Sequence, residues 1–172
     1  MRLLRNANVL QGFISWDDVV HIPDTEKDKF LTFELSEGDI VLSLDRPIVN
    51  NGLKVSRLSS FDIPSLLLQR VGRFQLSDKI HTSYLYAFLN SPKFIDSISG
   101  HDQSLGVPHI SPKQVEAMKI PLPSLEKQQI LSETVWEKIR MSQSLFKSLQ
   151  SQLNTINKLP AALLRQAFNG EL

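Results

Sequence analysis

The residues that could do chemistry in this chain gather in two polar segments near its middle. Sequence-specific contact with a nucleic acid needs hydrogen-bond donors and acceptors on loops that reach base edges, with lysine and arginine on the phosphates around them. In residues 45–54 an arginine could fork onto a guanine, an asparagine could pair with adenine, and a lysine could hold a phosphate. These side chains are Arg46, Asn50, Asn51 and Lys54. A hairpin turn explains the same residues equally well, with Asn50-Asn51-Gly52 serving the backbone and Arg46 paired with Asp45.

The second segment covers residues 101–113 and is predicted to be a polar loop. Its side chains combine donors and acceptors, and Gly106 gives its backbone freedom. The candidate DNA-contacting residues are His101, Gln103, Ser104, His109 and Lys113. The alternative is a solvated loop in which Ser111 only caps a short helix.

Two more arginines, Arg70 and Arg73, lie on a predicted strand over residues 65–74. Both are candidate DNA contacts, and for Arg70 a buried ion pair is an equally good explanation. The tryptophans Trp16 and Trp136 are predicted to pack and not to stack on bases. These arginines extend the candidate surface beyond the two loops.

Catalytic motifs are absent from the sequence. It contains no phosphate-binding loop, dinucleotide fingerprint, zinc-protease motif or nucleophile elbow, and no motif of an amino-methyltransferase. The four histidines form no metal-spaced pair. The sequence therefore predicts a binding protein without catalytic residues, metal or cofactor.

The composition indicates a cellular compartment and shows an uneven distribution of charge. The absence of cysteine fits a reducing cytoplasm, and no apolar run is long enough to span a membrane. Residues 14–39 hold eight acidic residues against two lysines, whereas residues 46–82 hold six basic residues against two aspartates. A basic segment beside an acidic one suits a surface that meets an anion on one side only, although ordinary charge clustering gives the same pattern.

The elements that must position these residues are short. Strands are predicted within residues 3–45, at 40–44 after a Gly-Asp turn signal, at 54–58 and at 65–74. Helices are predicted at 83–89, 94–98 and 113–117, the last with Ser111 as N-cap and a proline at its first position. Residues 119–122 could form a last edge strand, and the carboxylates of residues 17–28 are expected to be solvated loop charges.

The C-terminal third indicates a helical rod. Starting at Ser124 as N-cap, the rod has seam positions that recur in alternating steps of four and three and are apolar except at Ser142. A heptad seam of this kind must bury itself against another helix. Asn157 and Pro160 are expected to break or kink the rod before a final short helix. The residues expected to contact a partner helix are Val135, Ile139, Phe146, Leu149, Leu153, Ile156, Leu163 and Phe168.

Read in order, several blocks make the chain resemble the specificity subunit of type I restriction-modification systems, in a half-length form with one target recognition domain and one spacer helix. The blocks cover nearly the whole sequence, and their order and spacing make the resemblance specific. They are Leu4-Arg5-Asn6-Ala7-Asn8-Val9, Gly38-Asp39-Ile40-Val41-Leu42, Asp45-Arg46-Pro47, Gly52-Leu53-Lys54-Val55, Leu68-Gln69-Arg70-Val71, His109-Ile110-Ser111, Pro121-Leu122-Pro123 with Glu126 and Gln128, and Ala167-Phe168 with Gly170-Glu171-Leu172.

The resemblance implies a function and partners. In that family a target recognition domain reads one half of a split double-stranded DNA sequence, and paired antiparallel helices hold two such domains apart. Methyltransferase subunits grip the helices, and a motor-nuclease subunit joins them for cleavage. The family's domain normally opens with a stretch before Arg5 that this sequence lacks, so we expect part of the recognition fold to be absent.

These observations predict an α+β fold: a target recognition domain of short strands and helices over residues 1–120, then a helical spacer and dimerisation region over 121–172. A homodimer through antiparallel helices is expected, because each buried Leu or Ile is worth roughly 1.5–3 kcal/mol. The alternative function is a truncated assembly module that dimerises or binds partner subunits without reading DNA.

Overall fold

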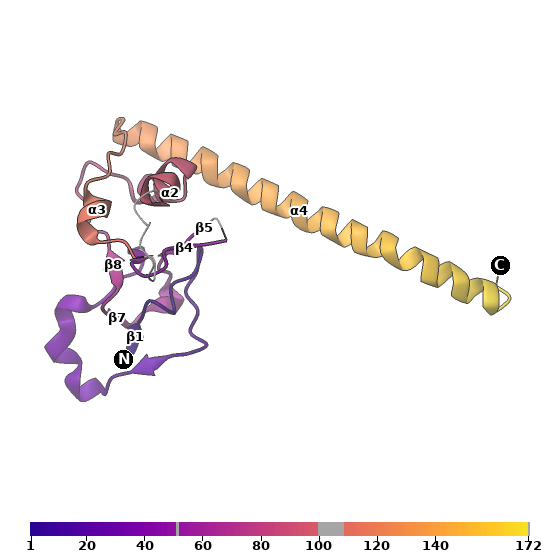
Figure 1. Cartoon of the computed structure of the whole chain (residues 1–172), viewed down its shortest axis with the longest axis horizontal. Coiled ribbons are helices and arrows are strands. Elements are labelled where there is room, and N and C mark those ends of the chain that lie inside the picture. Colours follow the sequence, from indigo (N-terminus) through magenta and orange to yellow (C-terminus); the bar gives the residue numbers. More distant parts are fainter. Residues whose placement is uncertain (51, 100–108, 172) are drawn as a thin grey trace. The chain divides into compact units, whose positions relative to one another are not determined.

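The computed structural model describes residues 1–50, 52–99 and 109–171. It divides into two units, Met1–Ser132 and Glu133–Leu172. The first unit combines short strands with short helices, and the second consists of the greater part of one long helix (Figure 1). The predicted α+β class with a long C-terminal helix is confirmed.

The centre of the first unit is a three-stranded antiparallel sheet with the order β6-β3-β8. Its strands are β3 (Ile40–Ser43), β6 (Val55–Arg57) and β8 (Val71–Arg73). All four residues of β3 are buried. The strand starts after Gly38, whose φ of 89° is one that glycine adopts without steric cost.

One face of this sheet packs against the three short helices, α1 (Thr82–Leu89), α2 (Pro92–Ser99) and α3 (Pro112–Glu116) (Figure 1). Successive residues of a strand point to opposite faces, so Ile40 and Leu42 of β3 enter this helix-covered core. The core also contains Leu53, Val55, Leu85, Leu89, Phe94, Ile98 and Ile110.

The other face of the sheet contacts a second core. Val41 of β3 joins Leu4, Val9, Leu35, Leu58 and Val71 there. A second sheet of order β2-β1-β7 borders this core, built from β1 (Arg2–Leu4), β2 (Val20–His21) and β7 (Ser65–Leu67). Trp16 packs against the same core, as the sequence predicted, and its indole N–H donates to Asp62 Oδ1 at 2.9 Å.

The remaining elements of the first unit are a hairpin and two 3₁₀ segments. Strands β4 (Ile48–Val49) and β5 (Gly52–Leu53) pair antiparallel. The 3₁₀ segments are η1 (Asp24–Phe33) and η2 (Ser60–Asp62). Part of the acidic stretch that was expected to be loop is therefore helical, although its carboxylates at Asp17, Asp18, Glu26 and Asp28 are exposed as expected.

Two strand predictions were wrong. Residues 65–74 form not one strand but β7 and β8, which belong to different sheets. The chain turns between them at Arg70, whose φ is 69° and is incompatible with a continuous strand. Residues 119–122 form no strand. The two prolines that follow Ile120 within three residues, Pro121 and Pro123, lack the N–H that a sheet ladder needs.

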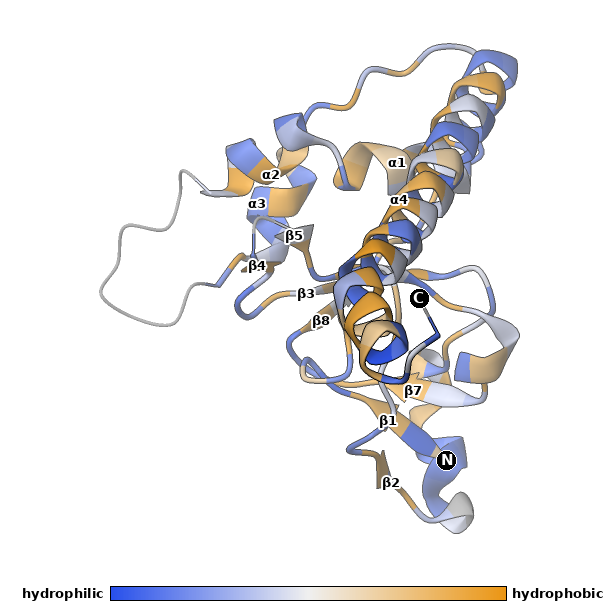
Figure 2. Ribbon diagram, turned by 90° about the vertical axis from the view of Figure 1, so that its right-hand side faces the viewer, coloured by the Kyte–Doolittle hydropathy of each residue, from blue (hydrophilic) through white to orange (hydrophobic). Residues whose placement is uncertain are grey.

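Helix α4 (Leu125–Phe168) is uninterrupted, so of the expected break or kink at Asn157 and Pro160, the break was wrong. An interior proline removes one backbone hydrogen bond and costs about 3 kcal/mol. Strong helix formers continue the helix on its far side, from Ala161 to Ala167. Apolar and polar residues alternate in bands along α4 (Figure 2).

The first two turns of α4 belong to the first unit because Gln128 and Ser132 are buried there. The Gln128 amide is fully buried and makes three hydrogen bonds. Its oxygen accepts the N–H of His81 at 2.8 Å, and its nitrogen donates to the carbonyls of Lys79 at 3.0 Å and Pro123 at 2.8 Å. The Gln128 side chain thus ties the start of α4 to the segment that leads into α1.

Gln128→Leu should destabilise the Met1–Ser132 unit by about 2–4 kcal/mol, because it removes three hydrogen bonds made by a fully buried amide, and a lost partner costs about 1–3 kcal/mol where water cannot replace it. Urea unfolding, followed through Trp16 fluorescence in a Trp136→Phe background, should show a lower midpoint. The matched control is Gln129→Leu, at an exposed position where water can replace any lost contact. Equal unfolding free energies for Gln128→Leu and the wild type would contradict the anchoring role.

Candidate nucleic-acid interface

The two polar segments singled out in the sequence meet where β3 leaves the core. Asp45 follows this strand after one residue and contacts three parts of the chain. Its carboxylate pairs with Arg70, Oδ1 to Nη1 at 3.0 Å, its backbone bridges His109 in antiparallel fashion, and its carbonyl accepts the Ser43 hydroxyl at 2.7 Å. The backbone adds two links, from Leu44 N–H to the Arg70 carbonyl and from Ile110 N–H to the Leu44 carbonyl, both at 2.9 Å.

The same region contains every residue other than glycine that has a positive φ within the described ranges. These are Arg46 at 46°, Asn50 at 48° and Arg70 at 69°. A left-handed backbone is uncommon for residues other than glycine. Asparagine adopts it at lower cost than arginine, because its short polar side chain can hydrogen-bond locally. Strained conformations of this kind cluster at functional sites, where the surrounding contacts hold them in place.

Asn50 stands at the turn of the β4–β5 hairpin, so the hairpin interpretation of this segment is confirmed. The Asn50 side chain is exposed, which leaves it accessible to a ligand as well. The amide of Gln11 donates to the Val49 carbonyl and ties the hairpin to the N-terminal segment. Asn51 lies outside the described residues.

Lys54 lies beneath the Arg46 loop, not on its surface. Only 9% of the residue is exposed, and Nζ donates to the Asn6 carbonyl at 3.0 Å. Burial lowers the pKa of Lys54, an effect that nearby Asp45 opposes and Arg46 reinforces. An ammonium group in this position supports the loop from inside, so we leave Lys54 out of the residues proposed to touch a phosphate.

Asp45 pairs with Arg70 instead of Arg46, which corrects the pairing considered from the sequence. The Arg70 pair is also not buried, since 62% of the arginine side chain is exposed. Among the described residues no acidic side chain forms an ion pair with Arg46, which is itself exposed. Arg46 and Arg70 therefore both present cationic groups beside Asp45.

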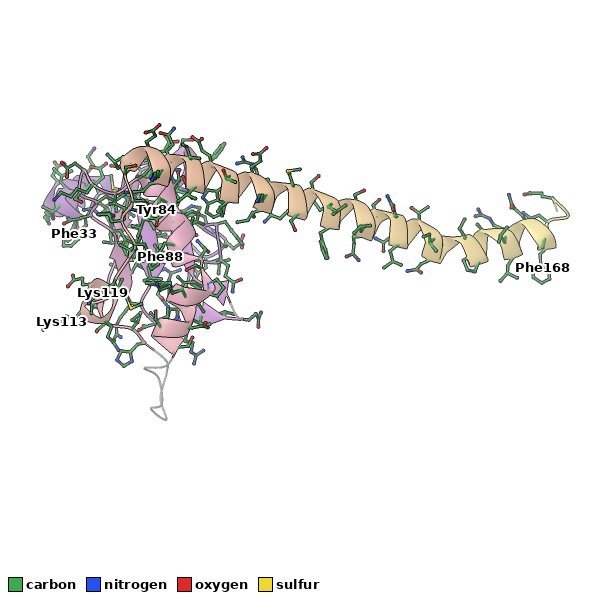
Figure 3. The ribbon with its side chains drawn as sticks, turned by 90° about the horizontal axis from the view of Figure 1, so that it is seen from above. Phe33, Tyr84, Phe88, Lys113, Lys119 and Phe168 are labelled. Atoms are coloured by element: carbon green, nitrogen blue, oxygen red, sulfur yellow. The ribbon has the colours of Figure 1, made fainter. Side chains whose placement is uncertain are left out.

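The remaining candidates differ in their surroundings. Arg73, at the far end of β8, lies 3.7 Å from Asp39 and donates to the Glu34 carbonyl at 2.8 Å, so its charge is engaged by the acidic segment. Lys113 is exposed on α3 (Figure 3). His109 is exposed next to the Asp45 bridge. His101, Gln103 and Ser104 lie outside the described residues.

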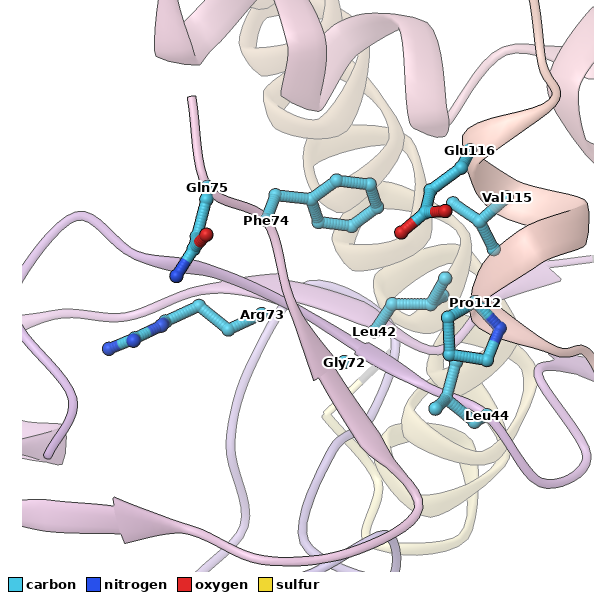
Figure 4. A pocket seen from close by; sticks show the side chains of 9 residues that line it. All are labelled: Leu42, Leu44, Gly72, Arg73, Phe74, Gln75, Pro112, Val115 and Glu116. Carbon is cyan, nitrogen blue, oxygen red and sulfur yellow. The ribbon is translucent and has the colours of Figure 1, made fainter. Parts of the chain in front are cut away.

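Helix α3 is fixed by the predicted cap. The Gln114 N–H donates to the Ser111 hydroxyl at 3.3 Å, and the Ser111 N–H donates to Gln114 Oε1 at 2.8 Å. This reciprocal capping box sets the direction in which the chain leaves the His109 bridge. Between α3 and the edge of the sheet lies a cavity of about 340 Å³, lined by Leu42, Leu44, Gly72, Arg73, Phe74, Gln75, Pro112, Val115 and Glu116 (Figure 4).

The geometry of the described residues offers binding groups. No cluster of three His, Asp or Glu side chains suitable for a metal ion occurs in residues 1–50, 52–99 and 109–171. None of the helices formed by these residues has the length and apolarity needed to cross a bilayer. The arrangement can donate and accept hydrogen bonds and present positive charge, which suits recognition of an anion with polar edges.

Sequence reasoning missed the supports of this site. Asn6 accepts from both the Lys54 ammonium and the Ser43 hydroxyl. Asn8 closes its own loop, accepting the Arg5 N–H at 3.0 Å and donating to the Ser15 carbonyl at 3.0 Å. Their only signal in the sequence was their presence in the Arg5-Asn6-Ala7-Asn8 block. The partners of Asn6 lie 37 and 48 residues along the chain, whereas those of Asn8 are nearby backbone groups.

Comparison with known proteins places the chain among DNA specificity domains. Residues 7–154 match the family described as the type I restriction modification DNA specificity domain, and the chain belongs to this family. It is 49% identical over 134 residues to the specificity subunit of the type I restriction enzyme EcoAI from Escherichia coli, covering 77% of this chain and 23% of the relative.

Two further comparisons extend over the whole chain. The specificity subunit of the enzyme MjaVIII from Methanocaldococcus jannaschii is 32% identical over 177 residues, which cover 100% of this chain and 40% of that protein. A chain from a structure concerned with assembly and conformational transition of the type I R-M system shares the fold, with a TM-score of 0.72 at 15% identity, and covers 100% of this chain and 39% of its own length. The chain thus spans 23% to 40% of the length of these relatives.

Lys54→Met should alter the pH dependence of stability. Burial holds the folded-state pKa of Lys54 below the usual 10.5. Between these two values the unfolded chain keeps a proton that the folded chain has lost, so wild-type stability gains as pH rises through that window. The unfolding free energy of the wild type minus that of Lys54→Met should therefore increase from about pH 7 to about pH 10.

The measurement is urea unfolding at both pH values. Lys127→Met is the matched control, because Lys127 is exposed, and its difference from the wild type should stay nearly constant. A constant difference for Lys54→Met as well would mean that Lys54 is not buried in the folded protein.

Proposed function

We propose that this chain is a DNA-sequence specificity subunit of a type I restriction-modification system, binding one half of a bipartite double-stranded target and having no catalysis of its own. The observation that supports this most is the meeting of the two polar segments at Asp45. It brings Arg46, Arg70 and His109 close to Asp45 at the end of β3, and Asn50 follows at the β4–β5 turn. Loops on a rigid scaffold are the usual carriers of recognition.

The chemistry of these side chains suits base edges and phosphates. An arginine fork matches guanine, and an asparagine amide matches adenine. Exposed Arg46, Lys113 and His109 add donors around them. The acidic segment lies elsewhere in the sequence and engages Arg73 through Asp39, so the proposed contacts leave Arg73 out.

The partners follow from the long helix. We propose that α4 docks methyltransferase subunits, and through them the motor-nuclease subunit, in the cytoplasm where the DNA target lies. We also propose a homodimer through antiparallel α4 helices. Phe146, Leu149 and Leu153 are 52–67% exposed in the single chain, and a heptad seam of this kind is stable only when another helix covers it. The side chain of Phe168 is 88% exposed (Figure 3).

The exposed seam also favours a second candidate, an assembly module that dimerises or binds partner subunits but does not read DNA. Both candidate functions use helix α4 for association, and they differ only in whether the loops bind DNA. A loop substitution that changes DNA preference supports the specificity subunit, whereas a seam substitution tests what both have in common.

Arg46→Ala should reduce sequence-specific binding about 5- to 150-fold and relax preference at one base, because a lost bidentate contact costs about 1–3 kcal/mol. The assay is a titration of labelled duplex with the chain and its methyltransferase subunit together. Lys29→Ala is the matched control: it removes the same charge from exposed η1, where Lys29 lies 3.9 Å from Glu26. Unchanged preference and rate of methylation in Arg46→Ala would favour the assembly module.

Phe146→Asp combined with Leu149→Asp should convert a dimer into a monomer, because two charges in the seam would have to be buried without partners. Sedimentation velocity at micromolar concentration measures the mass. The matched control is Ser144→Asp with Ser151→Asp, which adds the same charges about half a turn away around the helix. A wild type that is already monomeric would count against the antiparallel homodimer.

A further inference from the structure

Arg70 is held from two sides by the segment that leaves β3. Its carbonyl accepts the Leu44 N–H at 2.9 Å, and its Nη1 donates to Asp45 Oδ1 at 3.0 Å. Backbone and side chain are thus both fixed by neighbouring residues of one segment. The guanidinium nevertheless remains open to solvent, because 62% of the Arg70 side chain is exposed whereas only 26% of the Asp45 side chain is.

The backbone conformation at position 70 is unfavourable for an arginine. Its φ of 69° lies in the left-handed region, where glycine or asparagine would fit at lower cost. The turn between β7 and β8 is closed by a backbone hydrogen bond, in which the Val71 N–H donates to the Leu68 carbonyl at 3.3 Å, and it needs no particular side chain. An arginine in this position is therefore explained by what its side chain does.

The Asp45 contact determines what the Arg70 side chain can do. A guanidinium has five N–H donors in a rigid fork, and the carboxylate engages it through Nη1. A charge-assisted bond on one side fixes the orientation of the plane and removes rotamer freedom before any ligand arrives. Orientation adds little to a phosphate contact, which a flexible point charge can make, but a bidentate base contact depends on it.

We propose that Arg70 reads a guanine through O6 and N7 and that Asp45 is the positioning residue that aims its guanidinium. The inference rests on the proposed DNA-specificity function and names, within it, one base and the pair of side chains that recognises it. Arg70 is a specificity-determining residue in this account, and Asp45 acts only through it.

Strand β8, which follows Arg70, supplies an internal comparison. Arg73 lies three residues beyond Arg70 and also pairs with an aspartate, Asp39, at 3.7 Å. Both side chains of that pair are only 22% and 24% exposed, and Arg73 also donates to the Glu34 carbonyl at 2.8 Å. The Arg73–Asp39 pair therefore joins the acidic segment to the sheet and serves as the control for a structural ion pair.

The test uses the full chain with its methyltransferase subunit and a pool of duplexes randomised across the target. Sequencing of the methylated fraction gives the preference at each position. Arg70→Lys keeps the charge but loses the fork, so preference for guanine at one position should fall about 5- to 150-fold while the salt dependence of binding stays the same. Asp45→Asn should relax preference at the same position, and Arg73→Lys at none.

A charge reversal distinguishes recognition of the base by Arg70 from a purely structural role of the ion pair. Asp45→Arg combined with Arg70→Asp can restore an ion pair, and with it the urea midpoint, but it should not restore the guanine preference. Recovery of that preference would overturn the inference. If the reversed pair does not fold, Arg70→Lys alone decides, because it can still pair with Asp45 and its urea midpoint can be measured separately.

The two possible failures are distinguishable. A wild type that selects a sequence, together with an Arg70→Lys variant that selects the same sequence equally strongly, overturns the role of Arg70 and leaves the specificity function standing. A wild type that selects no sequence from the pool overturns the proposed function, and the assignment of Arg70 fails with it.

Discussion

The burial of β3 on both faces is the constraint on which the rest of the first unit depends. Ile40 and Leu42 fill the helix-covered core while Val41 fills the other one. A shift of one residue would exchange the two sets of side chains, so the register of this strand is fixed by both cores together. The place where the chain leaves the core at Asp45 is fixed with it.

That fixed exit explains how irregular loops are held in defined positions. Asp45 connects the turn at Arg70 with the segment at His109, and Lys54 supports the loop from beneath through Asn6. Each polar group that enters the interior here finds a partner, which offsets the cost of burying it. Left-handed residues at Arg46, Asn50 and Arg70 can persist because these contacts outweigh their strain.

The two parts of helix α4, before and after Ser132, are stabilised by different interactions. Its first two turns are held by the buried amide of Gln128, which completes the hydrogen bonding of the segment before α1. Beyond Ser132 the helix carries apolar side chains that remain largely exposed in one chain. The first part therefore completes a domain, and the second part is suited to association, since one amphipathic helix cannot bury its own seam.

The sequence alone determined the features that depend on neighbouring residues. The strand at 40–44, the Ser111 cap, the hairpin turn at Asn50, the heptad seam and the ordered blocks of the family all follow from local spacing. Tertiary structure decided the rest: the turn at Arg70, the pairing of Asp45 with Arg70, the burial of Lys54 and the hydrogen bonds of Gln128. The physical reason is separation along the chain. Arg70 and Asp45, Lys54 and Asn6, and Gln128 and its partners before α1 lie 25 to 49 residues apart, and no local pattern specifies which long-range contact a polar side chain will make.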